Sequence, residues 1–531
     1  MLIWLIIVPV IAAALIGLLK APGRATALVS ATFTLIMGVW AFISATYGGE
    51  DAINCWSTLG ERELWFSLEG PLSPIMLLLS VIVTFAAILG LKAPDKDAER
   101  SWSIAALLLS TGAIGAFVSD NIISFYAFHE LALIPTFVMI GFYGRGNRHT
   151  VAWTATVYLG LASMVLLAGL LMLCSEMRTY TFSGIRMAVQ YGMVPSSCLI
   201  PGLLLVGFGT LVSLFPFHAW AAPAYASAPT PIAMLHAGVL KKFGLYGLFM
   251  LAYCMGPVCK EFFGCWNNLL LLLLLGNVLW VGYVTVAQTR LDDMLGNSSV
   301  MHMGYIFLAF AAYIASAGNN ELAIRGAALL MLAHGLTIAL LFLLTGQIES
   351  QTRTLELDSM GGLGRKLPCL GFLFGLAGLA SIGLPLLANF AGEFTVFVSC
   401  FNGWQPGAAA ATTGCDVLSN IYHSLGSWLS DIWLIGSVFG WIFNAITCTL
   451  NTISGWFGGL GPVQLATLFA LWGLVISAIY MLRAFRRVFE GNVGLASERA
   501  TALSCSDKLS AAFLAFFIVL FGVAPFLIFI Y

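Results

Sequence analysis

Apolar stretches long enough to cross a lipid bilayer recur along nearly the whole chain. A membrane-spanning helix needs about 20 mostly apolar residues, and about 14 segments meet that requirement. They lie near residues 2–19, 27–47, 74–91, 102–119, 121–142, 151–173, 198–216, 229–255, 267–286, 298–316, 323–346, 371–399, 462–483 and 511–530. Of the 531 residues, 60% are hydrophobic and 9% are charged. The sequence therefore predicts an all-α polytopic membrane protein, and it excludes a soluble enzyme, a disordered chain and a nucleic-acid binder.

Positive charges alternate between the predicted loops. Of the 23 Lys and Arg residues, sixteen fall in one set of alternate loops, five in the opposite set, and two inside a span. The rich set holds Lys20, Arg24, Lys92, Lys96, Arg100, Arg145, Arg148, Arg290, Arg353, Arg365, Lys366, Arg483, Arg486, Arg487, Arg499 and Lys508. Because cytoplasmic loops carry an excess of Lys and Arg, we expect both termini on the outer side. A bacterial inner membrane, with the termini in the periplasm, is the predicted location.

Two segments bear on the predicted number and orientation of the spans. The first span has no basic region before it and no small-residue cleavage site after it, so we do not expect a cleaved signal peptide. The loop at about 401–460 carries no Lys or Arg but contains a long apolar, Trp-rich stretch. Two interpretations of this loop remain open, namely one or two helices lying in the interface or an extra hairpin across the membrane.

Ionisable residues inside the spans are the strongest functional signal. Glu130 and Glu393 are the two acidic residues there, and Lys241 and Lys242 are the two basic ones. Four histidines join them, His129, His236, His302 and His334. A charge at mid-bilayer costs about 2.5–3.5 kcal/mol and usually marks an ion or proton pathway. The alternative for each is a packing or hydrogen-bonded core residue, and on an α-helix Lys241 and Lys242 would point about 100° apart.

Helix-breaking residues interrupt two of the predicted spans. Pro216 stands within FPFH at 215–218, and Pro385 ends GLP at 383–385. Proline removes a backbone hydrogen bond inside a helix, and transporters build ion sites at such breaks. The broken spans are the seventh and the twelfth, which suggests a duplicated unit of five spans. A plain proline kink is the alternative.

Cofactor motifs are absent from the sequence. The 11 cysteines form no CxxC pair, and no Gly-rich phosphate-binding segment follows a strand. We therefore expect no metal, iron–sulfur or nucleotide site in this chain.

Seven sequence motifs resemble those of one family, in order along the chain. They are FHELALIP at 128–135, FPFHAW at 215–220, APT at 228–230 with HAGVLKKFGLYG at 236–247, SSVMHMG at 298–304, HG at 334–335, GLP at 383–385 with NFAGEF at 389–394, and YML at 480–482 with RVFEG at 487–491. These resemble the antiporter-like subunits of respiratory complex I, the NADH:quinone oxidoreductase. The glutamate of NFAGEF is similar to the subunit M branch, whose mitochondrial counterpart is subunit 4.

The resemblance implies a fold of two inverted five-helix repeats with broken seventh and twelfth helices. On that basis we divide the chain into three N-terminal helices (1–101), a first repeat (102–255), a second repeat (267–490, with the long outer insertion) and a last loop and helix (491–531). The family also implies membrane-arm partners, both homologous antiporter-like subunits and small membrane subunits. Flavin, iron–sulfur clusters and quinone would belong to partner subunits of this proton-translocating enzyme.

The resemblance also assigns roles in a proton relay. Glu130 matches the fifth-helix glutamate, Lys242 the eighth-helix lysine, and Glu393 the terminal carboxylate. His302 and His334 match the histidines of the tenth and eleventh helices. The seventh-helix lysine of the family is missing here, because Leu211 stands at its position.

The missing lysine leaves Glu130 without its usual partner. We expect one of His129, His236 or Lys241 to come within reach of its carboxylate. Three functions stay open, namely a proton-pumping subunit of complex I, an antiporter subunit of a cation/proton exchanger or membrane-bound hydrogenase, and a non-pumping spacer in the arm.

Overall fold

Helices make up nearly all of the structure, a computed structural model that describes residues 2–48, 66–68, 70–195, 197–402 and 460–528. Among these residues there is no strand, only isolated β-bridges such as that between Phe66 and Ser119. Helices suit apolar segments in hydrocarbon because every backbone hydrogen bond is made within the segment. The predicted all-α membrane fold is confirmed.

The helices alternate along the chain with short turns. The first group is α1 (Leu2–Leu18), α2 (Gly23–Tyr47), α4 (Ser73–Leu89), α5 (Lys96–Val118), α6 (Ile122–Tyr143), α7 (Arg148–Met177), α8 (Phe182–Gln190), α9 (Leu199–Val212), α10 (Ala221–Ser227), α11 (Thr230–Gly238) and α12 (Phe243–Met255). The second group is α13 (Cys259–Leu275), α14 (Gly282–Ala287), α15 (Leu291–Ala315), α16 (Glu321–Thr352), α17 (Leu363–Lys366), α18 (Pro368–Ile382), α19 (Ala388–Ser399), α22 (Pro462–Ala470), α23 (Trp472–Phe489), α24 (Leu495–Glu498) and α25 (Cys505–Val523). Short 3₁₀ segments are η1 (Leu240–Lys242), η2 (Gly256–Val258), η4 (Leu357–Ser359) and η6 (Pro525–Leu527), and η3 (Gly276–Val281) is a π-helical segment.

Every predicted span coincides with a helix or a broken helix. By length and composition, 9 helical segments among the described residues can cross a membrane, and four shorter apolar helices join them (α1, α4, α9 and α18). One of the 9, residues 230–287, is 58 residues long. A turn at Gly256, whose φ is +53°, divides it into two. The count of about 14 spans and the repeat boundaries remain predictions, and residues 403–459 of the long loop lie outside the described residues.

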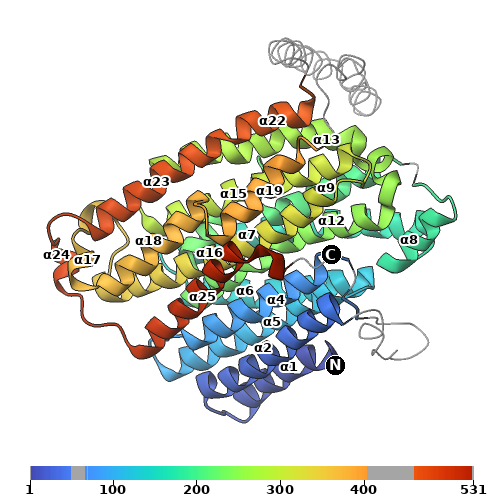
Figure 1. Ribbon diagram of the computed structural model, residues 1–531. Coiled ribbons are helices and arrows are strands. Elements are labelled where there is room, and N and C mark those ends of the chain that lie inside the picture. Colours follow the sequence, from blue (N-terminus) through green and yellow to red (C-terminus); the bar gives the residue numbers. More distant parts are fainter. Residues whose placement is uncertain (1, 49–65, 69, 196, 403–459, 529–531) are drawn as a thin grey trace.

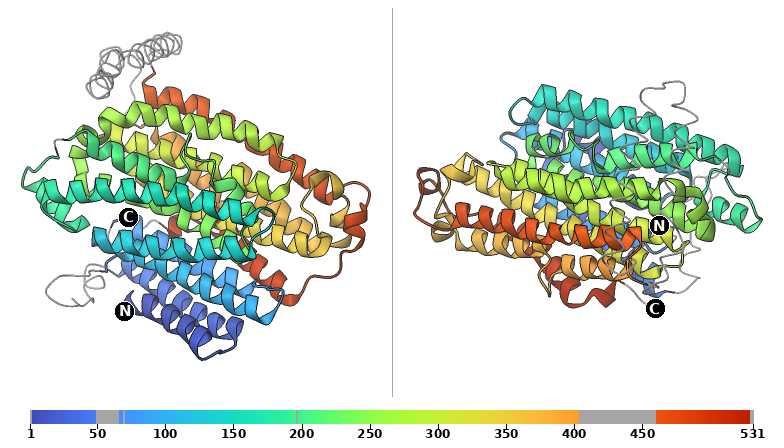
Figure 2. Two further views of the ribbon diagram at one scale, coloured as in Figure 1. Left: turned by 180° about the vertical axis from the view of Figure 1, so that it is seen from behind. Right: turned by 90° about the horizontal axis from the view of Figure 1, so that it is seen from above.

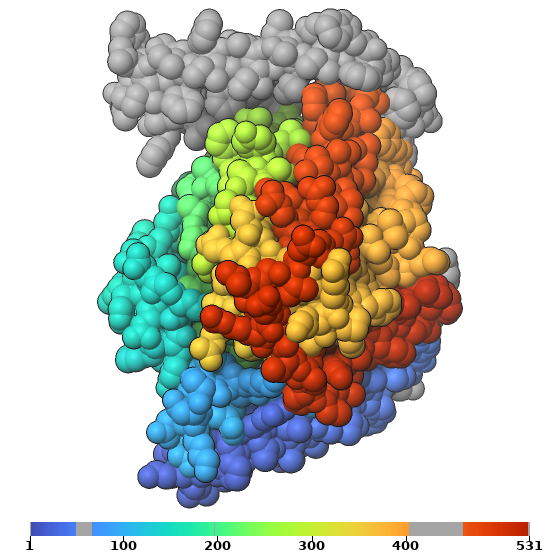
Figure 3. Space-filling view, turned by 90° about the vertical axis from the view of Figure 1, so that its left-hand side faces the viewer, coloured from blue at the N-terminus to red at the C-terminus, as the bar shows by residue number. Residues whose placement is uncertain are grey.

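The long helices lie side by side with their axes along one common direction (Figures 1 and 2). α1, α2 and α5 form one edge of the molecule, and α22, α23 and α13 form the opposite one (Figure 1). α15 and α16 run through the interior, and the apolar part of α16 is wholly buried. The C-terminal α25 returns to pack against α4, α16 and α19. Figure 3 looks along the bundle at the end where α17 and α24 gather.

Side-chain caps fix where several helices begin. Asp95 accepts a hydrogen bond from the Ala98 amide (2.7 Å) at the start of α5. Asn121 and Asn320 cap α6 and α16 in the same way, and Ser504 forms a reciprocal capping box at the start of α25. Such caps satisfy amides that the first helical turn leaves without partners.

Candidate functional site

The first predicted helix break lies between α9 and α10. α9 ends at Val212, and Ser213 adopts a left-handed conformation with φ +69°. The amide of Leu214 closes the helix end by donating to the carbonyl of Gly209 (2.7 Å), and α10 begins only at Ala221. The break therefore exposes several backbone groups inside the bundle.

The side chain of Asn277 contacts this break from another helix, and within the break the indole nitrogen of Trp220 donates to the Thr210 carbonyl (3.0 Å). Asn277 is fully buried in the π-helical segment η3. Its amide nitrogen donates to the carbonyls of Ser213 and Val300 (both 3.0 Å), and its carbonyl oxygen accepts from the amide of Phe215 (2.6 Å). Sequence reasoning missed Asn277, although its one signal was a polar residue inside the apolar run LLLLLLLGNVLWV at 269–281.

The second break lies between α18 and α19. Gly383 ends α18 with φ +82°, and Leu386 has φ +74° before α19 begins at Ala388. His302 from α15 faces the broken end, with Nε2 at 3.0 Å from the Ser381 carbonyl and Nδ1 at 2.8 Å from the Ser298 carbonyl. A neutral imidazole has one N–H, so only the doubly protonated ring donates to both carbonyls.

A third break, which the sequence did not predict, carries the two lysines. α11 ends at Gly238, and Lys241 and Lys242 occupy the 3₁₀ segment η1 before α12 begins. The Nζ atom of Lys242 donates to the Ala237 carbonyl (2.6 Å). The Nζ atom of Lys241 lies 3.3 Å from the Ser299 hydroxyl. The two lysines thus have different partners, as expected, yet both ammonium groups are buried at the centre of the bundle.

Aromatic rings line the space between these lysines and α6. The Lys241 Nζ atom lies 5.2 Å from the centre of the Tyr225 ring, within cation–π range. His236 lies beside Trp220 and Tyr225, with ring centres 5.7 and 5.3 Å apart. The His236 Nδ1 atom is buried and has no hydrogen-bond partner among the described residues.

The contact expected between Glu130 and a neighbouring base is present. Oε1 of Glu130 lies 3.4 Å from Nδ1 of His129 and accepts a hydrogen bond from the hydroxyl of Ser163 on α7. The His129 ring is buried and stacks on Phe243 at 4.0 Å. The Glu130 side chain is 35% exposed, so it reaches the surface of α6. Leu211 is buried near the end of α9.

The remaining predicted residues form a second group. The rings of His302 and His334 have centres 5.5 Å apart, and His302 Nε2 lies 4.0 Å from Glu393 Oε1. Lys242 and Lys241 are close enough to His334 to interact with it electrostatically. The structure thus places all eight predicted residues along one band from α6 to α19, which is buried except at Glu130.

Three buried polar atoms of this band have no hydrogen-bond partner among the residues that the structure describes. They are Nδ1 of His236, Nδ1 of His334 and Oε1 of Glu393. A buried polar atom normally has a hydrogen-bond partner, and ordered water supplies it where protein does not. The band therefore combines titratable groups with hydrogen-bonding atoms that protein groups leave unused, and such atoms can bind water and exchange protons.

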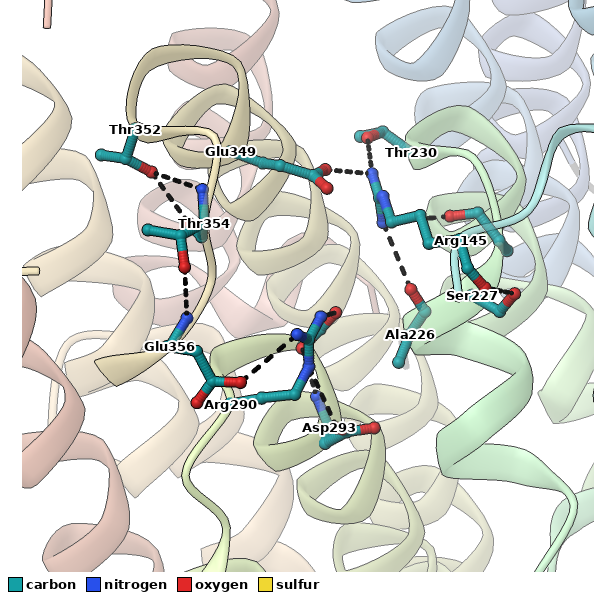
Figure 4. Close-up of polar contacts among 12 residues, drawn as sticks. Arg145, Ala226, Ser227, Thr230, Arg290, Asp293, Glu349, Thr352, Thr354 and Glu356 are labelled. Atoms are coloured by element: carbon teal, nitrogen blue, oxygen red, sulfur yellow. Dashed lines mark hydrogen bonds and ion pairs between the residues drawn. The ribbon is translucent and has the colours of Figure 1, made fainter. Parts of the chain in front are cut away.

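Arg145 lies between the start of α11 and the C-terminal part of α16, and several polar groups surround its guanidinium (Figure 4). Its guanidinium pairs with Glu349 on α16 (2.6 Å) and lies 3.3 Å from the Ala226 carbonyl and 3.4 Å from the Thr230 hydroxyl. The Ser227 hydroxyl donates to the Arg145 carbonyl (2.8 Å). Arg145 therefore ties the turn between α10 and α11 to α16, which the sequence did not reveal.

A second cluster in Figure 4 surrounds Arg290. Its guanidinium lies 2.8 Å from Asp292, 3.4 Å from Asp293 and 3.4 Å from Glu356. The hydrogen bonds that Arg290 donates to the Asp292 carboxylate raise the pKa of Arg290, since they favour the charged guanidinium.

No group of three or more His, Cys, Asp or Glu side chains within the part of the chain that the structure describes could hold a metal ion.

Comparisons with known proteins agree on one family. A family model described as "NADH:quinone oxidoreductase/Mrp antiporter, TM" matches residues 119–419. NAD(P)H-quinone oxidoreductase chain 4 2 of Microcystis aeruginosa is 31% identical over 371 residues, which cover 70% of this chain and 63% of that protein.

Two solved structures share the fold. A chain in respiratory complex I from Thermus thermophilus with bound NADH aligns over 99% of this chain and 96% of its own length, with 23% identity and a TM-score of 0.77. A chain in the archaeal membrane-bound sulfane sulfur reductase aligns over 98% of this chain and 76% of its own length, with 21% identity and a TM-score of 0.78.

Proposed function

Because the chain belongs to the NADH:quinone oxidoreductase/Mrp antiporter transmembrane family, we propose that it is a membrane-arm subunit of a proton-pumping NADH:quinone oxidoreductase. Its partners would be the homologous antiporter-like subunits and the small membrane subunits of that arm. Flavin, iron–sulfur clusters and quinone would reside in other subunits. The proposed location is a bacterial inner membrane, with both termini on the periplasmic side.

The buried band from Glu130 to Glu393 carries this proposal. Lys242 is fully buried, and Glu393 is 3% exposed and lies 4.0 Å from His302. Ionisable groups so deep in hydrocarbon are costly, and they are kept where an ion or proton must pass. In the proposed relay, Glu130 with His129 forms one end, Lys242 the centre, and His302, His334 and Glu393 the other end.

The compensation for the absent seventh-helix lysine is part of the proposal. His129 is in contact with Glu130, whereas Lys241 and His236 make their contacts deeper in the bundle. We assign to His129 the place of the missing partner of the Glu130 carboxylate, since its Nδ1 atom lies 3.4 Å from Oε1 of Glu130. Lys241 and His236 would carry the proton between that pair and Lys242.

A second candidate is an antiporter subunit of a related ion-translocating complex. Two observations favour it, the Mrp antiporter in the family description and the fold shared with a chain of the archaeal sulfane sulfur reductase. The subunits that purify with this chain distinguish the two candidates. Flavin and iron–sulfur subunits with NADH:quinone activity support complex I, and their absence from an intact, transporting assembly contradicts it.

Replacing Lys242 tests the relay itself. In the purified complex, reconstituted into vesicles, Lys242→Ala is expected to lower the number of protons moved per electron pair while leaving the subunit composition unchanged. Lys366→Ala, at an exposed position on α17, is the matched control and is expected to pump normally. Unchanged pumping by the Lys242 variant would contradict the relay and favour a non-pumping spacer in the arm.

A further inference from the structure

Two cysteines meet where α9 begins. Cys198 is the residue immediately before α9, and Cys265 lies in the first half of α13. Both are free thiols, Cys198 exposed and Cys265 partly buried. The Cys265 thiol is close enough to the Cys198 thiol for the two to interact electrostatically. The pair therefore joins two helices through residues that lie more than sixty positions apart in the sequence.

Contacts beside the thiols fix their positions. The indole nitrogen of Trp266, next to Cys265, donates to the carbonyl of Cys198 itself (2.8 Å). The same indole packs on Gly202, one turn into α9, so closely that a side chain there would collide with the ring. The two cysteines are thus held together by contacts that do not involve sulfur.

The same two helices meet again at the first break. α9 ends at Val212, and the carbonyl of the following residue, Ser213, accepts from Asn277, which lies on the π-helical continuation of α13. A covalent link at the start of α9 would limit sliding of α9 against α13. It would therefore restrict the break that Asn277 holds.

We propose that Cys198 and Cys265 are a redox-sensitive thiol pair that closes into a disulfide and clamps α9 to α13. The oxidant is a disulfide, from a thiol–disulfide oxidoreductase or a small molecule. The exposed Cys198 thiolate attacks it and forms a mixed disulfide, and Cys265 then displaces the second sulfur. One disulfide is reduced to two thiols as the new bond forms, so protons and electrons balance.

The charge distribution favours this chemistry at this end of the bundle. Arg178 and Arg186, in the preceding connection, belong to the loops poor in positive charge and thus to the predicted outer side. Disulfides form and persist in the periplasm, whereas cytosolic thiols stay reduced. The clamp does not depend on whether the subunit pumps protons.

Mass spectrometry of the complex in its native membrane tests the pair. The reduced complex is treated with oxidised glutathione, and the remaining thiols are alkylated before digestion. We expect a linked pair of peptides containing Cys198 and Cys265, with a mass about 2 Da below the summed mass of the two reduced peptides, because the new bond removes two hydrogen atoms. Cys198→Ser and Cys265→Ser should lose this product, and Cys505→Ser, at another exposed cysteine, should keep it.

The other outcomes contradict the proposal. Glutathione retained on Cys198, or alkylation of both thiols after oxidation, would show that the pair does not close. Oxidation by a membrane-impermeant disulfide only in inverted vesicles would overturn its outer location. Amide exchange at residues 213–217 should slow in the oxidised form, and unchanged exchange would refute the clamp.

Discussion

Replacing Asn277 with leucine is expected to loosen the first helix break while the subunit stays folded. Leucine has the same branched side-chain skeleton as asparagine, but it is bulkier and its methyl groups form no hydrogen bonds, so the Asn267→Leu control carries the same gain in volume. The substitution removes the acceptor for the Phe215 amide and the donor for the Ser213 carbonyl, both at a fully buried position. The surrounding apolar packing of α13 and α15 is otherwise retained.

The size of the effect follows from the two groups left without partners. A buried donor or acceptor without a partner costs about 1–3 kcal/mol, so the local opening free energy should fall by about 2–6 kcal/mol. Relaxation of the segment and entry of water reduce this to about 2–4 kcal/mol. Because 1.4 kcal/mol is a factor of ten, local opening should be roughly 30-fold to 1000-fold more frequent.

Hydrogen exchange read by mass spectrometry measures this opening directly. Peptides that cover residues 209–220 should exchange faster in Asn277→Leu by that factor. Asn267→Leu is the matched control, because Asn267 is also buried on α13 but donates to the Ala311 carbonyl (3.3 Å), away from the break. Exchange of the Phe215 amide within twofold of the unchanged protein would refute the assigned role of Asn277.

Two further substitutions probe the contacts of Arg145 and the second break. Arg145→Gln removes the ion pair to α16 and should lower the stability of the complex by about 1–3 kcal/mol in thermal unfolding. The control Arg325→Gln, in an exposed ion pair within α16, should change it by less than about 0.5 kcal/mol, and equal effects of the two substitutions would contradict the role of Arg145. Gly383→Ala adds a Cβ against the Glu393 carboxylate, and Gly491→Ala has the same φ of +82° but open space. Both substitutions introduce the same backbone strain, but only Gly383→Ala also displaces the Glu393 carboxylate. Only Gly383→Ala should therefore lose coupled transport, and normal transport by this variant would show that Glu393 does not depend on the geometry of the break.

The residues of the band could be predicted because charge is rare in hydrocarbon. Glu130, Lys242 and Glu393 stand out in apolar helices by residue type alone, and the helices there have the predicted bounds to within a few residues. Pro216 and Pro385 likewise marked two breaks, since proline removes a backbone hydrogen bond inside a helix.

Features that depend on tertiary packing could not be predicted in this way. The break at Lys241 follows from packing of α11 and α12 against their neighbours, and no proline marks it. Arg145 lies far in sequence from Glu349, so only the fold brings them together. Asn277 differs from other polar residues in apolar runs only through its contacts with a distant loop.

Bound water observed in an experimental structure of the complex, at a resolution that shows ordered solvent, tests the account most directly. We predict ordered waters that hydrogen-bond to Nδ1 of His236, Nδ1 of His334 and Oε1 of Glu393, the three atoms of the band without a partner among the described residues. These waters should form a continuous chain that passes by the Lys242 ammonium. A dry apolar gap between Lys242 and Glu393, closed to water in every state of the enzyme, would contradict the relay.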